Sequence, residues 1–183
     1  MCMRRFLIVC ALLVPGSLVL TADPEMGFAE PASAADIARV YWATFPDGKN
    51  LPVGSGTAIK GKALFETHCA SCHGLDGEGT LANQLVGGRG TLDSKTPVKT
   101  IGSYWPYATT VFNYIRRAMP FTAPMSLSND DYYALTAYLL NMNDIVADDA
   151  VIDGDSLSKV RMPNRDGFVN AYPKVPKAYD FME

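Results

Sequence analysis

The feature that most constrains this chain is a pair of cysteines followed at once by a histidine, in the segment Cys69-Ala70-Ser71-Cys72-His73. Two thiols separated by two residues, with a histidine next in line, form the attachment pattern of a c-type haem. A short turn lets both sulfurs reach the two vinyl groups on one edge of a porphyrin, and the next residue brings an imidazole to the iron. The motif therefore predicts one covalently bound haem c, with Cys69 and Cys72 in thioether bonds and His73 as an axial ligand.

Two other kinds of site use the same cysteine spacing. A thioredoxin-like redox pair does not need the histidine, and a zinc site needs further cysteine or histidine ligands. Outside the motif, the cysteines and histidines of the chain are Cys2, Cys10 and His68. Haem attachment is therefore the favoured interpretation, and the redox pair and half of a zinc site stay as alternatives.

The N-terminus is typical of an exported protein. Two arginines precede an apolar run over residues 6–20, and small residues follow it. This order predicts a secretory signal peptide over residues 1–22, cleaved after Ala22 or, alternatively, after Ala34. A membrane anchor is disfavoured because the run is short and a Pro-Gly pair interrupts it. We expect a periplasmic protein without a stable membrane anchor, which fits the attachment of haem outside the bacterial cytoplasm.

Charge limits the classes of partner. The formal net charge of the 183-residue chain is −3, and it becomes −5 once the two arginines of the signal peptide are removed. An acidic chain of this kind is not expected to bind nucleic acid. Charge complementarity instead predicts a protein partner with a basic docking face.

Helical patterns fill the middle of the chain and predict an all-α domain over residues 57–143. Thr57 is a good N-cap for a helix that reaches about Ala70, and a second helix is expected to begin at Pro106 and end before Pro120. A third follows Ser128, with acidic residues in its first turn. The stripes expected to be buried are Val111, Tyr114, Ile115 and Ala118 in the second helix, and Tyr132, Leu135, Leu139 and Met142 in the third.

Less regular segments flank this domain. Residues 23–56 form an N-terminal arm, and its proline- and glycine-rich part, residues 46–56, is interpreted either as a linker or as an arm lying along the domain. Residues 144–183 form an extended C-terminal tail with aromatic anchors. The tail is expected either to wrap around the core or to dock a partner, and the pattern does not choose between these.

A haem that carries electrons usually needs a second axial ligand, and no further histidine is well placed. Methionine sulfur is the remaining good ligand. Met119 is favoured because it lies at a helix end, where the chain can aim a side chain, and Met125 on the same loop is the alternative. An open iron is the third possibility, and Met142 and Met162 are interpreted as packing residues.

Three further residues are candidates for contact with the haem. Arg89 can pair with a haem propionate, although a solvated arginine explains it as well. Trp105 and Tyr107 belong to an aromatic cluster that is either core or a wall of the haem pocket with propionate contacts.

With these pieces in order, the chain resembles a class I cytochrome c, a fold of helices around one covalently bound haem. In that family the first and last helices cross, which implies contacts among Gly61, Phe65 and Tyr138. Further blocks resemble one subgroup, which contains the haem subunits and acceptor cytochromes of periplasmic molybdenum sulfite dehydrogenases and the cytochrome subunit of the Sox sulfur dehydrogenase. The resemblance covers about residues 36–168. Its blocks are Pro46-Asp47-Gly48, Leu51-Pro52, Gly54-Ser55-Gly56-Thr57, residues 101–110, Tyr114-Ile115-Arg116-Arg117-Ala118-Met119-Pro120 and Met162-Pro163-Asn164-Arg165-Asp166-Gly167-Phe168.

The resemblance implies that Met119 is the distal ligand and that the protein carries single electrons without being an enzyme itself. The implied donor is a periplasmic molybdenum sulfite dehydrogenase, and the implied acceptor is a terminal oxidase or another cytochrome. A permanent haem subunit of such a dehydrogenase and a gas-sensing haem remain as alternatives.

Two departures from the family pattern matter. The Sox subunit commonly has a second haem domain, whereas this chain has one CxxCH motif. Many cytochromes also place a proline about a dozen residues after the haem histidine to orient its other nitrogen. Here no proline lies between His73 and Pro97, so the sequence names no acceptor for that N–H.

Overall fold

The computed structural model describes residues 31–35 and 43–171 and divides the chain into two units, residues 1–40 and 41–183. The first unit is described only over residues 31–35, so the fold is that of the second unit. The predicted signal peptide, residues 1–22, lies outside the described residues. Within the described ranges, no helix has the length and apolar character needed to cross a membrane.

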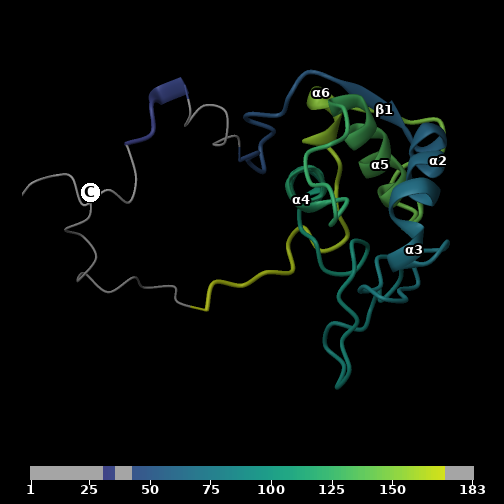
Figure 1. The fold of residues 1–183 in the computed structure, drawn as a ribbon. Coiled ribbons are helices and arrows are strands. Elements are labelled where there is room, and N and C mark those ends of the chain that lie inside the picture. The colour runs from purple at the N-terminus through teal and green to yellow at the C-terminus, as the bar shows by residue number, and fades with distance from the viewer. Residues whose placement is uncertain (1–30, 36–42, 172–183) are drawn as a thin grey trace, which may run out of the picture. The chain divides into compact units, whose positions relative to one another are not determined.

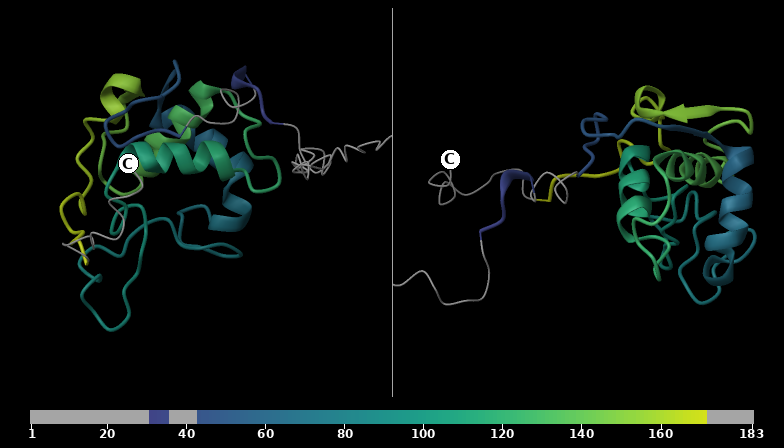
Figure 2. Two further views of the ribbon diagram at one scale, coloured as in Figure 1. Left: turned by 90° about the vertical axis from the view of Figure 1, so that its left-hand side faces the viewer. Right: turned by 45° about the horizontal axis from the view of Figure 1, so that its top comes forward.

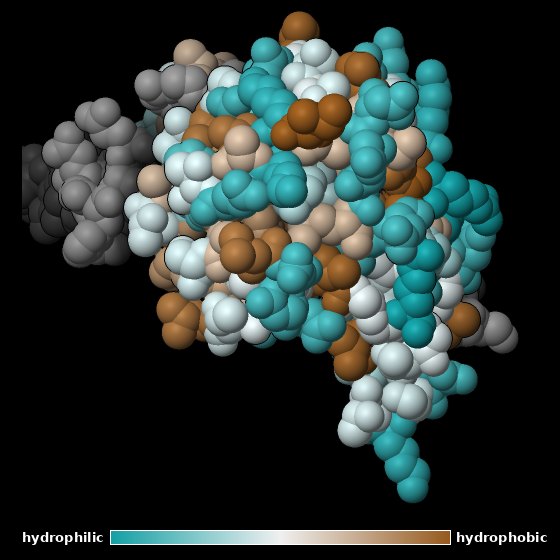
Figure 3. All heavy atoms as spheres, turned by 90° about the vertical axis from the view of Figure 1, so that its right-hand side faces the viewer, coloured by the Kyte–Doolittle hydropathy of each residue, from teal (hydrophilic) through white to brown (hydrophobic). Residues whose placement is uncertain are grey.

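Helices dominate the second unit, as predicted, and a minimal two-stranded sheet accompanies them (Figure 1). The long connection over residues 74–107 projects below the helices (Figures 1 and 2), and its residues 93–97 are exposed. On the face viewed in Figure 3 this projection is mainly hydrophilic, and hydrophobic side chains above it are scattered among polar ones. The elements are β1 (Ser55–Thr57), α2 (Ala58–His68), α3 (Ala70–His73), α4 (Ala108–Ala118), α5 (Asn129–Asn141), β2 (Val151–Asp153) and α6 (Gly154–Leu157).

Local capping determines where α2 and α5 begin. The Thr57 side chain accepts a hydrogen bond from the Lys60 backbone N–H at 3.3 Å, which confirms Thr57 as the N-cap of α2. Ser128 and Asp131 form a reciprocal capping box at the start of α5. Both caps satisfy backbone donors that the first helical turn leaves without partners, so these starts could be predicted from the sequence.

The prediction for α4 is wrong in two respects. The helix begins at Ala108, and Tyr107 is its N-cap with the extended backbone usual at that position, φ −139°. The Arg165 guanidinium of the tail lies 4.1 Å from the centre of the Tyr107 ring. Tyr114 is 51% exposed, whereas Phe112 on another face of the helix is fully buried. Tertiary packing, and not the expected stripe alone, decides which side chains the core covers.

The predicted helix crossing is confirmed. α2 packs more extensively against α5 than against any other described element. A Cβ atom built on Gly61 would lie 2.0 Å from the carbonyl oxygen of Ala134, so only glycine permits this approach. The rings of Phe65 and Tyr138 pack with centroids 5.5 Å apart. α5 is buried on most sides. Three residues of its expected stripe, Tyr132, Leu135 and Leu139, are buried, and Met142 is half-buried.

Residues 43–56 of the arm and the described part of the tail both lie along the helical core. β1 pairs antiparallel with β2, with Gly56 opposite Ile152. The Tyr133 hydroxyl donates a hydrogen bond to the Pro52 carbonyl at 2.8 Å, and Met162 of the tail is fully buried, as its interpretation as a packing residue required. Neither strand was predicted from the sequence, because each has only three residues and needs the other to form.

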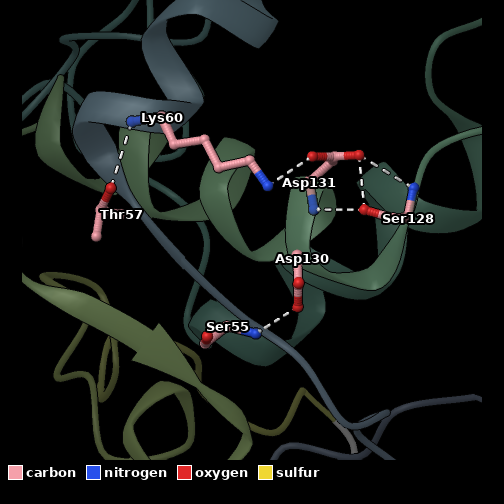
Figure 4. Close-up of polar contacts among 6 residues, drawn as sticks. All are labelled: Ser55, Thr57, Lys60, Ser128, Asp130 and Asp131. Atoms are coloured by element: carbon pink, nitrogen blue, oxygen red, sulfur yellow. Dashed lines mark hydrogen bonds and ion pairs between the residues drawn. The ribbon is translucent and has the colours of Figure 1, made fainter.

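Figure 4 shows polar contacts that join β1, α2 and the first turn of α5. The Ser55 backbone N–H donates to the Asp130 carboxylate at 2.9 Å. Lys60 forms an ion pair with Asp131 at 2.9 Å, while the Ser128 hydroxyl donates to the same carboxylate at 2.6 Å. The acidic first turn of α5 therefore binds both β1 and α2, which follow one another directly and lie far from α5 in the sequence.

We expect Asp131→Asn to destabilise the protein by about 1 kcal/mol at pH 7, because a side chain of a capping box loses its charge. The hydrogen bond from Ser128, followed by the contacts with Lys60, lowers the pKa of Asp131 below its usual 3.8. A lowered folded-state pKa means that this stabilisation is present above the unfolded-state value and is lost as pH falls through the folded-state value.

Urea unfolding of the holoprotein between pH 2 and pH 7 tests this prediction. The difference between wild type and Asp131→Asn should be largest at pH 7 and should vanish at the acidic end. Asp149→Asn, which removes an exposed carboxylate of the tail, is the matched control and should have little effect at any pH. A difference that persists unchanged to pH 2 would contradict the assigned role.

Candidate functional site

A cavity of about 470 Å³ brings together most of the residues predicted to bind the haem. Both cysteines and His73 reach it from the end of α2 and from α3, and Met119 reaches it from the end of α4. In Figure 1 and in the right-hand view of Figure 2, α3 and α4 lie on opposite sides of the lower part of the fold. The rest of the lining is largely apolar and includes Phe65, Leu81, Leu85, Ile101, Trp105, Val111, Tyr114, Ile115, Phe121, Leu135 and Leu139.

The CxxCH segment is held as a tight helical turn. The Cys69 N–H donates to the Phe65 carbonyl at 2.8 Å, and the His73 N–H donates to the Cys69 carbonyl at 3.0 Å. The glycine-rich loop then folds back, and the Ala82 N–H donates to the Cys72 carbonyl at 2.9 Å. These backbone bonds leave both sulfurs and the imidazole at the cavity wall.

The imidazole of His73 is oriented by the backbone of the same loop. Its Nδ1 atom lies 2.8 Å from the carbonyl oxygen of Asn83. A carbonyl oxygen can only accept, so Nδ1 must carry the proton and Nε2 keeps a free lone pair, as an iron ligand requires. Asn83 thus supplies the acceptor that the missing proline left unnamed. No sequence signal could have revealed it, because every residue has a carbonyl.

The environment of Cys69 does not favour the two competing interpretations of the motif. Burial, followed by the nearby Cys72, raises the pKa of the Cys69 thiol to about 11. A redox-active pair needs a thiolate near neutral pH. A bound zinc ion deprotonates its own thiol ligands, so a zinc site is judged by the ligands available to it. Within the described ranges, no group of three His, Cys, Asp or Glu side chains is placed to hold a metal ion.

Met119 and Met125 lie on the same loop but in different surroundings. Met119 caps α4, its N–H donates to the Ile115 carbonyl at 2.8 Å, and its side chain lines the cavity. The buried Tyr132 hydroxyl contacts the Met119 carbonyl at 3.5 Å and accepts from the Leu127 N–H at 3.2 Å, which ties down both ends of the loop. Met125 is 55% exposed and is not among the described residues that line the cavity. The geometry favours Met119, which stays a prediction as the distal ligand.

The three candidates for propionate contact are placed differently from one another. Trp105 lines the cavity, and its ring packs edge-on against Tyr114. Tyr107 lies under the guanidinium of Arg165, and Arg89 donates to the backbone carbonyl of Asn143. Neither Tyr107 nor Arg89 is among the described residues of the cavity lining, and their contact with the haem stays a prediction.

Asn143 is a residue that the sequence did not single out. It is buried directly after α5, and its side-chain amide donates to the carbonyls of Leu85, at 3.2 Å, and Leu139, at 2.9 Å. The Oδ1 atom of the same side-chain amide accepts from the Gly87 N–H at 3.3 Å. Asn143 therefore fastens the loop that carries Leu85 of the cavity wall to the end of α5. An asparagine just after a helix is otherwise a common residue, so it gave no signal.

These observations fit a covalently bound haem. A cavity of this size lies within the usual range for cofactor sites. Cys69 and Cys72 would hold the two thioether bonds, His73 presents an unprotonated Nε2, and Met119 offers a thioether sulfur to the same space. The apolar lining suits the faces of a porphyrin.

Comparisons with known proteins agree with this geometry. Residues 58–143 match the family model described as Cytochrome c. Among solved structures, the chain is similar to a chain in the "Crystal Structure of the Sulfane Dehydrogenase SoxCD from Paracoccus pantotrophus", with 42% sequence identity and a TM-score of 0.73. The match covers 83% of this chain and 80% of that one. A search of curated proteins found no match.

Proposed function

Because this chain belongs to the cytochrome c family, with the class I fold and covalently bound haem c, we propose that it is a periplasmic monohaem electron carrier. We propose further that it accepts single electrons from a molybdenum sulfite dehydrogenase and passes them to a terminal oxidase or another cytochrome. The similarity to a chain of a sulfane dehydrogenase supports the link to sulfur oxidation.

The observation that carries this proposal is the single cavity that combines both cysteines, His73 and Met119. The haem supplies reversible one-electron exchange at its iron. The Asn83 carbonyl holds the proton of His73 on Nδ1. The hydrogen bonds of the Tyr132 hydroxyl with Met119 and Leu127 hold the loop that carries Met119. His73 and Met119 would both hold the iron, which would keep substrates from it and limit the rearrangement that accompanies the gain or loss of an electron.

The chemistry of the donor sets the stoichiometry. Oxidation of one sulfite and one water gives sulfate, two protons and two electrons. One copy of a monohaem carrier takes one of these electrons, so two copies are reduced for each sulfite consumed.

Stopped-flow reduction of the oxidised holoprotein tests the proposal. A molybdenum sulfite dehydrogenase, mixed with sulfite and this protein, should reduce two equivalents of the protein for each sulfite. Omission of sulfite is the control for non-specific reduction. If sulfite dehydrogenases do not reduce the protein while a dehydrogenase for another substrate does so rapidly, the proposed donor is wrong.

A permanent haem subunit of a sulfite or sulfur dehydrogenase is the second candidate, because the similar chain comes from a structure titled as a dehydrogenase. Purification from the native cell extract separates the two. A mobile carrier leaves the dehydrogenase at moderate salt, whereas a fixed subunit stays with it. Periplasmic location is tested by cell fractionation, in which the haem-stained protein should be released with the periplasmic fraction.

A further inference from the structure

A second hollow of about 480 Å³, the Arg117 groove, lies beside the haem cavity. Trp105 and Tyr114 line both spaces, and their ring centroids are 5.7 Å apart. One pair of aromatic rings therefore separates the groove from the haem site. The full lining of the Arg117 groove is Trp105, Thr110, Asn113, Tyr114, Arg117 and Ala118.

The groove offers hydrogen-bond donors that lack partners. The Oδ1 atom of Asn113 accepts from the Thr44 N–H at 3.4 Å, which leaves Asn113 Nδ2 as a donor. Over the described ranges, neither this amide nor the Trp105 indole N–H has a hydrogen-bond acceptor, and Arg117 has neither a hydrogen bond nor an ion pair. Arg117 is also exposed. Three donors, one of them a cation, thus line one hollow.

The local charge is opposite to that of the whole chain. The chain has a net charge of −3, yet no aspartate or glutamate is among the described residues that line the haem cavity or the Arg117 groove. Lys99 lines the cavity, with its ammonium group 5.2 Å from the centre of the Tyr104 ring. At physiological salt, charges are screened beyond about 8 Å, so a docked group responds to these nearby cations more than to the net charge.

We propose, on the basis of the electron-transfer function above, that the Arg117 groove receives an acidic side chain of the protein that exchanges electrons with this chain. A carboxylate can accept two parallel hydrogen bonds from a guanidinium, and the Asn113 amide adds a third donor. The net charge favoured a basic docking face on the partner, whereas the groove requires an acidic one. Docking there places the partner against Trp105 and Tyr114, the wall of the haem cavity.

The test compares an anionic and a cationic oxidant on the reduced holoprotein by stopped flow. Each reaction moves one electron from the protein, to ferricyanide to give ferrocyanide, or to tris(phenanthroline)cobalt(III) to give cobalt(II). At low ionic strength, Arg117→Gln should lower the ferricyanide rate constant by roughly threefold to tenfold, because steering by local charge is lost. The cobalt rate constant should stay the same or rise.

Lys159→Gln is the matched control, because it removes one positive charge just after α6, from a residue that does not line the groove. Equal effects of the two variants, or a wild-type ferricyanide rate that rises with ionic strength, would overturn the proposal. A changed reduction potential in Arg117→Gln with an unchanged ratio of the two rates would assign Arg117 to a haem carboxylate and also overturn it.

A protein donor adds a second comparison. With a dehydrogenase that reduces the wild type, Arg117→Gln should lower the second-order rate constant at low ionic strength, and Lys159→Gln should not. An unchanged rate constant in Arg117→Gln would contradict docking at the groove. A sulfite dehydrogenase that fails to reduce the wild type counts against the proposed donor, and the ferricyanide comparison still decides on the groove.

Discussion

Met119→Ala is expected to convert the protein from one that excludes ligands into one that binds carbon monoxide. Met119 is the proposed distal ligand, and removal of its thioether would leave a coordination position of the iron open, so the reduced variant should bind one carbon monoxide per haem at neutral pH, whereas the wild type should bind none. The oxidised variant should also lose the sulfur-to-iron charge-transfer band in the far red. Its reduction potential should fall, because a thioether ligand raises the potential of a haem.

Met125→Ala is the matched control, because Met125 lies on the same loop but is exposed. This variant should keep the charge-transfer band and should not bind carbon monoxide. Retention of the band in Met119→Ala would overturn the assignment of the ligand. Carbon monoxide binding by the reduced wild type would instead favour the gas-sensing alternative.

Gly61→Ala is expected to destabilise the holoprotein by about 3 kcal/mol, although alanine normally favours a helix by up to about 1 kcal/mol over glycine. The added Cβ would lie 2.0 Å from the Ala134 carbonyl oxygen and 2.7 Å from the Tyr138 Cβ. The carbonyl belongs to the backbone of α5 and cannot turn away as a flexible side chain could. The variant must therefore separate α2 from α5, and urea unfolding measures the cost.

Gly154→Ala provides the control for the loss of glycine itself. A Cβ atom there meets its nearest side-chain atoms at 3.5 and 3.8 Å, which is ordinary contact. This variant should unfold within about 0.5 kcal/mol of the wild type, as surface substitutions usually do. Equal stability of Gly61→Ala and the wild type would show that the crossing of α2 and α5 tolerates a larger separation.

Patterns that act over a few residues could be predicted from the sequence. The attachment motif over residues 69–73, the caps Thr57 and Ser128, and the helix end before Met119 each depend on chemistry within one or two turns. Such local interactions are determined by the identity of neighbouring residues, whatever the rest of the chain does. The class I cytochrome c fold could be predicted because these local features occur in the family order.

Contacts between distant segments were decided by the tertiary structure alone. The Asn83 carbonyl reaches His73, the Arg165 guanidinium packs on the Tyr107 ring, and Asn143 fastens the loop before Trp105. Backbone carbonyls leave no trace in residue identity, and a packing partner from a distant segment has no fixed spacing that a pattern could reveal. The sign of the charge around the haem cavity also could not be predicted from the sequence. Net charge sums over the whole chain, whereas a partner meets only the side chains that the fold brings to one surface.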